Sequence, residues 1–131
     1  MAVKATPVFT QSPVCGIAQI SSANTNRDGT GSLGTVYTAG ANGGRIELIR
    51  VKATVTTTAG MVRIYVSTNG GTNKYLWAEI SIGANTVSAS NPGAEGEFSP
   101  TKPLMLPASA IVYASTHNAE TFNVFAHGGD L

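Results

Sequence analysis

Histidine and glutamate residues near the C-terminus offer the clearest chance of chemistry in this chain. His117 and Glu120 lie three residues apart and His127 follows, so three possible metal ligands fall in one short stretch. The stretch has no helical period, however, and outside a helix this spacing does not place two ligands on one face. We therefore expect surface or turn-capping histidines here, and neither a metal site nor a cofactor.

Two further groups of residues have types that catalysis or phosphate binding could use. Glu95 and Glu97 could form the carboxylate pair of a glycosidase, but two acids so spaced in a polar loop are common by chance. The glycine clusters Gly40–Gly44 and Gly70–Gly71 do not lead into helices that could hold phosphate, and no GxSxG, HExxH or P-loop motif is present. We expect hairpin turns at the glycines and a protein that is not an enzyme.

Aromatic and arginine side chains form the candidate site for contact with a partner. The strand pairing inferred below gathers them on one outer face: Arg50, Arg63, Tyr65, Tyr75 and Trp77. Aromatic residues and arginine are enriched where proteins meet partners. Two structural alternatives compete, namely that the cluster packs under a loop or belongs to the core with the two faces reversed. Sugar stacking on the rings is the glycan-binding version of the same hypothesis.

The stretch Gly44–Ser67 carries the strand pattern on which this site depends. Apolar and polar residues alternate over Ile49–Thr56 and again over Val62–Ser67, with the period of two that is typical of half-buried strands. Thr57–Gly60 separates the two runs and indicates a β-hairpin or a corner. Ile46 lies out of phase with Ile49, which predicts a bulge or a crossing between sheets.

Residues Tyr75–Ile82 continue the alternation and predict a partner for the second run. One register keeps apolar residues together on one face and opposite charges together on the other. It pairs Val66 with Leu76, Ile64 with Ala78, Val62 with Ile80, Arg63 with Glu79, and Tyr65 with Trp77.

The rest of the chain adds further short strands separated by turns. They are expected at Gly16–Ile20, Leu33–Ala39, around Glu97–Ser99, from Leu104 and Leu106 through Ala110–Ser115 as one strand, and at Phe122–His127. About eight strands without a helix fit an all-β fold, an antiparallel β-sandwich, with a jelly roll as one form of it. Pro7 and Pro13 predict an extended N-terminal arm over residues 1–14, followed by a single β-sandwich domain over residues 15–131.

Composition narrows the possible partners. Cys15 is the single cysteine, so we expect a buried or otherwise ordinary thiol, with an intermolecular disulfide or a reactive thiol as the alternative. Only 11% of residues are charged and the formal net charge is +1, which does not favour nucleic acid. The start MAVKATPVF lacks the apolar core of a signal peptide, and no apolar run approaches the roughly 20 residues of a membrane helix. We expect a protein made and used in soluble form, with no membrane partner.

The charges are unevenly distributed along the chain. The segment from Arg45 to Lys74 contains five basic residues and one acidic residue, a net charge of +4. The segment from Glu79 to the end contains five acidic residues and one basic residue, a net charge of −4. Such a separation could let copies meet basic side to acidic side. The alternative is that the two halves interleave in space and cancel.

Four stretches carry a resemblance to a known class of proteins. Ala23–Gly31 (ANTNRDGTG), Gly44–Val66, Leu76–Ile80 (LWAEI) and Ser115–Leu131 resemble small all-β structural proteins of tailed bacteriophages and prophages. The resemblance implies a virion structural protein, a capsid decoration or head-fibre-like protein. Such a protein would be made in the host cytoplasm and placed on the capsid exterior, bound to the major capsid protein lattice as a homotrimer. The alternative is a tail or fibre-tip module that binds a host glycan or receptor.

Overall fold

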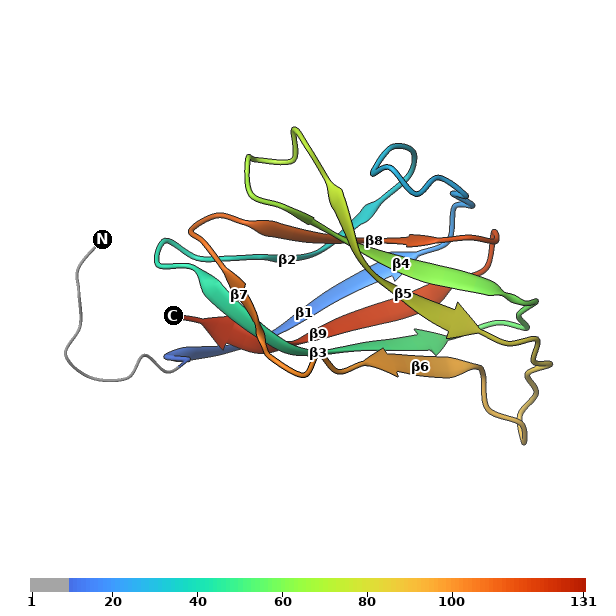
Figure 1. The fold of residues 1–131 in the computed structure, drawn as a ribbon. Coiled ribbons are helices and arrows are strands. Elements are labelled where there is room, and N and C mark those ends of the chain that lie inside the picture. The colour runs from blue at the N-terminus through green and yellow to red at the C-terminus, as the bar shows by residue number, and fades with distance from the viewer. Residues whose placement is uncertain (1–9) are drawn as a thin grey trace.

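The computed structural model describes residues 10–131, which contain nine β-strands and no helix. The strands are β1 (Ser12–Ile20), β2 (Gly34–Thr38), β3 (Gly44–Ala53), β4 (Gly60–Ser67), β5 (Tyr75–Ile82), β6 (Glu95–Phe98), β7 (Leu104–Leu106), β8 (Ile111–Thr116) and β9 (Phe122–Asp130). Sheet A has the order β1-β9-β3-β6, with β7 also paired to β3, and sheet B has the order β2-β8-β4-β5. Figure 1 shows the two antiparallel sheets as packed layers, so the predicted β-sandwich is confirmed.

The strand pairs follow one another as if a long ribbon had been folded back on itself. β1 pairs with β9, β2 with β8, β3 with β6, and β4 with β5, and every pair is antiparallel. The ribbon crosses between the sheets as it proceeds, so that β9 also meets β3 and β8 also meets β4. The two sheets therefore enclose one core. A jelly roll, as a finer form of this architecture, stays a prediction.

The core lies between the sheets because alternate residues of each strand point inward. Its fully buried side chains come from central strands of both layers and include Ile49, Val51, Val62, Ile64, Val112 and Val124. Burial of each such side chain contributes roughly 1.5–3 kcal/mol. The period of two read from the sequence is therefore the period that builds the core.

Glycines allow the two sheets to approach closely along both sides of the sandwich. On one side a Cβ added to Gly16 of β1 would lie 2.4 Å from the carbonyl oxygen of Val36 in β2. On the other side a Cβ added to Gly96 of β6 would lie 2.6 Å from the side chain of Ile80 in β5. A side chain at either glycine would force the layers apart.

The phase change near the start of β3 is a bulge, the first of the two predicted alternatives, and not a crossing between sheets. The register of β3 against β9 shifts between Ile46 and Leu48, so Glu47 is the extra residue. Ile46 and Ile49 are both buried despite their odd separation. β3 and β4 belong to different sheets, so Thr57–Gly60 lies in a corner and not in a β-hairpin.

The predicted register of β4 against β5 is right over half of its length and wrong over the rest. Val62 faces Ile80, Arg63 faces Glu79, and Ile64 faces Ala78 as predicted. A register shift follows, and Tyr65 faces Leu76 instead of Trp77. Trp77 is the bulged residue, and it turns toward the core, where it packs edge to face against Phe98 with ring centroids 4.9 Å apart.

Two predicted element boundaries are also corrected. The segment expected as one strand from Leu104 to Ser115 is two strands in different sheets, because β7 pairs with β3 while β8 pairs with β4. β1 begins at Ser12, so residues 12–14 belong to sheet A and not to an arm. Residues 1–9 of the predicted arm lie outside the described residues.

Candidate binding surface

The five predicted contact residues do not form one cluster. Arg50 lies on β3 in sheet A, whereas Arg63, Tyr65, Tyr75 and Trp77 lie on β4 and β5 in sheet B. The prediction of one outer face was wrong because it took β3 and β4 as neighbours in a single sheet. Each residue has its own environment.

Tyr65 is fully buried on the outer side of sheet B, beneath the β1–β2 loop (residues 21–33). Its hydroxyl donates to the carbonyl oxygen of Asn26 in that loop at 2.8 Å. Asn24 anchors the loop, since its buried side-chain amide donates to the carbonyl oxygens of Thr30 and Ser32, each at 2.9 Å. The alternative that the cluster packs under a loop therefore holds for Tyr65.

Asn24 is a residue that sequence reasoning missed. It is 5% exposed, and its Oδ1 also accepts a hydrogen bond from the backbone N–H of Asn26. The available signal was the run of short polar residues and glycines in ANTNRDGTG, because Asn and Asp hold turns through bonds to nearby backbone. Nothing in that run marks which asparagine is buried.

Arg63 is a nearly buried charge with a carboxylate partner. It is 6% exposed, and its Nε donates to Glu79 Oε2 at 3.0 Å. Arg27, from the β1–β2 loop, donates to Glu79 Oε1 at 2.6 Å. These two hydrogen bonds hold the pKa of the Glu79 carboxyl below its usual value despite partial desolvation, and the bond from Arg27 has the larger effect. Arg63 therefore holds sheet B together and is little exposed to a partner.

Tyr75 is the one predicted contact residue with a largely free side chain, at 66% exposure. It borders an open cleft of about 460 Å³ between the β1–β2 loop and the β4–β5 turn. Basic, acidic and amide groups line the cleft with it, among them Arg27, Asp28, Asn73 and Lys74. The pKa of Asp28 is lowered by hydrogen bonds from the side chain and backbone of Thr30. The cleft offers one ring and several hydrogen-bonding groups to a polar ligand.

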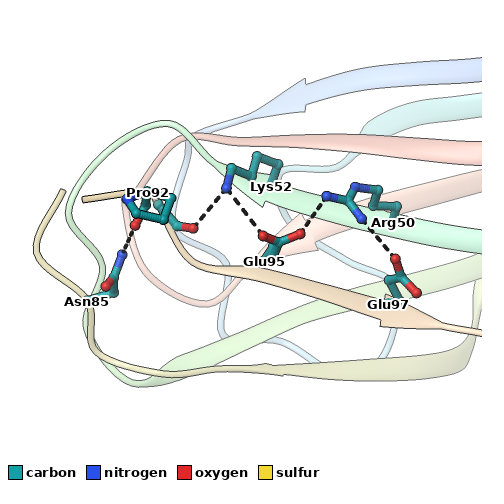
Figure 2. Close-up of polar contacts among 7 residues, drawn as sticks. Arg50, Lys52, Asn85, Pro92, Glu95 and Glu97 are labelled. Carbon is teal, nitrogen blue, oxygen red and sulfur yellow. Dashed lines mark hydrogen bonds and ion pairs between the residues drawn. The ribbon is translucent and has the colours of Figure 1, made fainter. Parts of the chain in front are cut away.

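Arg50 takes part in an ion network on the outer face of sheet A, shown in Figure 2. It bridges β3 and β6, with Nη2 at 2.5 Å from Glu95 Oε2 and Nη1 at 2.9 Å from Glu97 Oε1. Lys52 lies 3.5 Å from the other oxygen of Glu95 and donates to the carbonyl oxygen of Gly93 at 3.0 Å. Beside the network, Asn85 donates to the carbonyl oxygen of Pro92 and braces the preceding loop.

The ion pairs show whether the basic and acidic segments of the sequence are separated in space or interleaved. Basic residues of β3 and β4 are paired with acidic residues of β5 and β6: Arg50 with Glu95 and Glu97, Lys52 with Glu95, and Arg63 with Glu79. The basic and acidic halves therefore interleave in space and largely cancel. Glu95 and Glu97 are both ion-paired with basic side chains on the outer face of sheet A.

Apolar side chains also lie on the outer face of sheet A, interspersed with His127 and the ion-paired Arg45 and Glu47. Ile17 of β1 is 60% exposed and faces Phe125 of β9, and Phe125 faces Arg50. Leu48 follows on the next row of β3, opposite His127. Met105 of β7 is 55% exposed. We call Ile17, Leu48, Met105 and Phe125 the apolar face.

The histidines and acids near the C-terminus are separated by the fold. Glu120 Oε2 accepts hydrogen bonds from the N–H and the hydroxyl of Thr58, each at 2.9 Å, and Nδ1 of His117 lies 3.4 Å from Nη1 of Arg63. His127 is exposed on sheet A. Among residues 10–131 no three His, Cys, Asp or Glu side chains gather as metal ligands.

Comparisons with family models, with curated proteins and with solved structures found no match to this chain. Within the described part of the chain, no helix is long and apolar enough to span a membrane.

Proposed function

We propose that this protein is a non-enzymatic structural component of a tailed-bacteriophage virion, which stabilises the head by binding the major capsid protein lattice from outside. The observation that carries the proposal is the apolar face, where Ile17 and Met105 are exposed and Leu48 and Phe125 are half-buried, beside charges already paired within the chain. Exposed apolar patches bordered by polar residues mark surfaces that bind proteins. Side chains spread over the outer face of a sheet suit the surface of another protein better than a small ligand, which binds in a concave pocket.

The strand order supports a virion role by analogy. A ribbon folded back on itself, with paired strands β1–β9, β2–β8, β3–β6 and β4–β5, is the arrangement expected of a jelly roll. Jelly rolls are frequent in viral capsid proteins and in lectins. Fold supports many functions, so this analogy adds to the resemblance noted in the sequence without replacing an experiment.

Binding to a repeating lattice would require only modest contacts from each copy. A homo-oligomer presents its apolar faces together, and several weak contacts then act as one strong attachment. A trimer is the favoured state because threefold and quasi-threefold points recur on an icosahedral shell. The trimer comes from the resemblance, and no residue specifies it.

The test uses the phage or prophage whose genome carries this gene. Electron microscopy of particles should locate the chain on the capsid exterior, and capsids from a gene deletion should open at lower temperature or milder osmotic shock than parental capsids. Adding back the purified protein should restore resistance, whereas an Ile17→Asp, Met105→Asp double variant should not. Finding the chain only on the tail, or deletion capsids as resistant as the parent, contradicts the capsid role.

The cleft beside Tyr75 supports a second candidate, a tail or fibre-tip module that binds a host glycan. Its volume of about 460 Å³ is within the range of ligand sites, and an exposed ring beside cationic and amide groups suits a polar sugar. A glycan array separates the two functions. Glycan binding that Tyr75→Ala abolishes would favour the tip module, and binding to capsids without any glycan binding would favour decoration.

A further inference from the structure

The four outer edges of the sandwich are not equally protected against pairing with another strand. β6 is only four residues long and carries Glu95 and Glu97. β5 is bulged at Trp77 and carries Glu79, and β2 is five residues long with a register shift around Val36. Short length, charge and bulges are the usual devices that prevent edge pairing.

β1 has none of these three features, and the one edge-protecting residue that it carries is Pro13, near its start. It is nine residues long, carries no charged side chain, and pairs with β9 without a register shift from Ser12 to Ile20. Within residues 10–131 no strand pairs with its other side. Ile17, next to its central residue, is 60% exposed. Only Pro13 interrupts the row of backbone donors.

Backbone hydrogen bonds show which residues of β1 face the open side. At the end of β3, Ala53 donates to Ala94 on the β6 side, whereas Thr54, the next residue, donates to Thr121 on the β9 side. Backbone groups of successive residues point to opposite sides of a strand, so β9 bonds β3 through its odd-numbered residues and β1 through its even-numbered ones. The odd-numbered residues of β1 therefore point their N–H and C=O groups outward. Pro13 is among them, where its missing N–H costs no bond within the sheet.

We propose that β1 pairs antiparallel with β1 of a second copy across a twofold axis. The register that overlaps all nine residues places Gly16 on the axis and sets Cys15 opposite the partner's Ile17. It also pairs odd-numbered with odd-numbered residues, as the hydrogen bonds require. All three outward donors, the N–H groups of Cys15, Ile17 and Gln19, then find carbonyl acceptors. Sheet A becomes continuous through both copies.

A second copy fits this edge well because β1 is uncharged and its hydrogen-bonding residues match their own copies across a twofold axis. No charged residue of β1 would be brought against another, so pairing buries no charge and needs no counter-ion. Each exposed Ile17 gains an apolar neighbour. A single strand pair is smaller than a standard stable interface, so we expect a dimer that dissociates on dilution. This pairing does not depend on the proposed virion role, and in a trimer it would link two trimers.

The single thiol reports the pairing directly. In the proposed register the two Cys15 residues are diagonal neighbours, with Cα atoms about 7–8 Å apart. That is beyond the usual reach of a disulfide and within the reach of a short bismaleimide. Sedimentation across roughly a hundredfold range of concentration should show reversible doubling of mass, and the bismaleimide should give a covalent dimer at concentrations where mass doubles. Cys15→Ala should sediment in the same way but give no covalent dimer.

A charge at the centre of the edge should prevent pairing without unfolding the chain, since the Ile17 side chain is mostly exposed. Ile17→Lys should weaken self-association at least roughly tenfold. Tyr75→Lys is the matched control, because it places the same charge at a residue of similar exposure on β5, and it should leave association unchanged. Unaltered circular dichroism and thermal unfolding would show that both variants are folded.

Other outcomes would overturn the proposal. A monomer at all concentrations, or an oligomer in which the bismaleimide fails to join Cys15 and Ile17→Lys has no effect, means that β1 does not pair with β1. Pairing that occurs only after deletion of residues 2–9 means that the edge is occupied by the chain's own N-terminal segment. A capsid role could survive either result, so failure of this inference is distinguishable from failure of the proposed function.

Discussion

A tyrosine and an aspartate join the two sheets at the end of the sandwich where β9 finishes, and we predict that Tyr37→Phe destabilises the protein. Tyr37 of β2 is 4% exposed, and its hydroxyl donates to Asp130 Oδ1 at 2.5 Å. The same oxygen accepts the N–H of Gly40, in the turn between β2 and β3, at 3.1 Å. The hydroxyl therefore links sheet B to the last residue of β9 in sheet A.

The magnitude follows from the kind of bond that is lost. Hydrogen bonds to charged groups contribute roughly 1.5–3 kcal/mol, and a carboxylate oxygen that loses one donor is left partly unsatisfied. Asp130 is only half-buried and keeps the N–H of Gly40. We expect Tyr37→Phe to lower the free energy of unfolding by about 2 kcal/mol. Urea unfolding of both proteins at neutral pH measures the difference as a shift of the midpoint at constant slope.

The loss of stability at alkaline pH provides an independent check. Burial, and then the hydrogen bond to Asp130, raise the pKa of the Tyr37 phenol above its ordinary value. A group whose pKa is raised on folding contributes stability that is fully present below its unfolded pKa, here about 10, and is lost as the pH rises through the folded pKa. The difference in free energy of unfolding between the parent and Tyr37→Phe should therefore be constant up to about pH 10 and should become smaller above it.

Tyr75→Phe is the matched control, because its ring is 66% exposed and it should change stability by less than about 0.5 kcal/mol. A double-mutant cycle with Asp130→Asn isolates the pair. If Tyr37→Phe costs no more than the control, or if the two substitutions add without coupling, the hydroxyl does not join the sheets and the reasoning fails.

Two further predictions concern the close approach of the sheets and the buried charge. Gly16→Ala would place a Cβ 2.4 Å from the carbonyl oxygen of Val36, and should cost about 1–3 kcal/mol, whereas Gly83→Ala, with open space around it, should be nearly neutral in the same thermal unfolding assay. Glu79→Gln should destabilise the protein at neutral pH, because it leaves Arg63 without its carboxylate. Because the pKa of Glu79 is lowered on folding, the stability difference between the parent and Glu79→Gln should be complete above about pH 4.3 and should vanish as the pH falls through the folded pKa. A stability difference that persists in acid would contradict this assignment.

The local pattern of the sequence was sufficient for strands and for one irregularity within a strand. Alternation depends on which side chains are apolar, and this is written directly in segments such as Val62–Ser67. Ile46 and Ile49 are both apolar at an odd separation, and a regular strand cannot turn both inward. An irregularity here could therefore be predicted without knowing which strand lies beside β3, but the choice of a bulge over a crossing between sheets could not.

The bulge in β5 could not be predicted in this way. Leu76, Ala78 and Ile80 alternate without a break, so the sequence gives no sign of an extra residue. Trp77 packs edge to face against Phe98, which comes from a different strand of the other sheet. An aromatic pair of this kind contributes roughly 0.5–1.5 kcal/mol beyond the area it buries. Contact over a long sequence separation thus decided a register that local pairing rules assigned differently.

The candidate site was difficult to predict for the same reason. Whether Arg50 lies beside Arg63 depends on which sheet each strand joins, and alternation does not encode that choice. Whether Tyr65 is exposed depends on a loop that folds over sheet B, and the loop is held by Asn24 through bonds to its own backbone. Tyr75 was identified correctly as a large side chain at a surface, but its neighbours in the cleft come from the β1–β2 loop.

The pairing of charges within the chain leads to a prediction about attachment. Arg50, Lys52 and Arg63 already have acidic partners, so the charge separation read from the sequence leaves little free charge for partners. Exposed ion pairs are screened by salt with a Debye length of about 10 Å at 0.1 M, whereas burial of apolar surface is not. We therefore expect the affinity for gene-deleted capsids to change by less than about threefold between roughly 0.05 and 0.5 M NaCl. Over this range the Debye length falls from above to well below about 10 Å, so an attachment through charge would weaken.

Attachment through the apolar face and attachment through charge give opposite results in this assay. Ile17→Asp should abolish binding at every salt concentration, and Glu97→Gln, which removes one acid from the paired network, should have little effect on binding at any of them. If binding instead falls steeply with salt, and if Glu97→Gln alters that slope, the network is opening to engage the partner. The apolar face would then be the wrong surface, and the contact should be sought at Arg50, whose guanidinium would have exchanged an acid of its own chain for one on the shell.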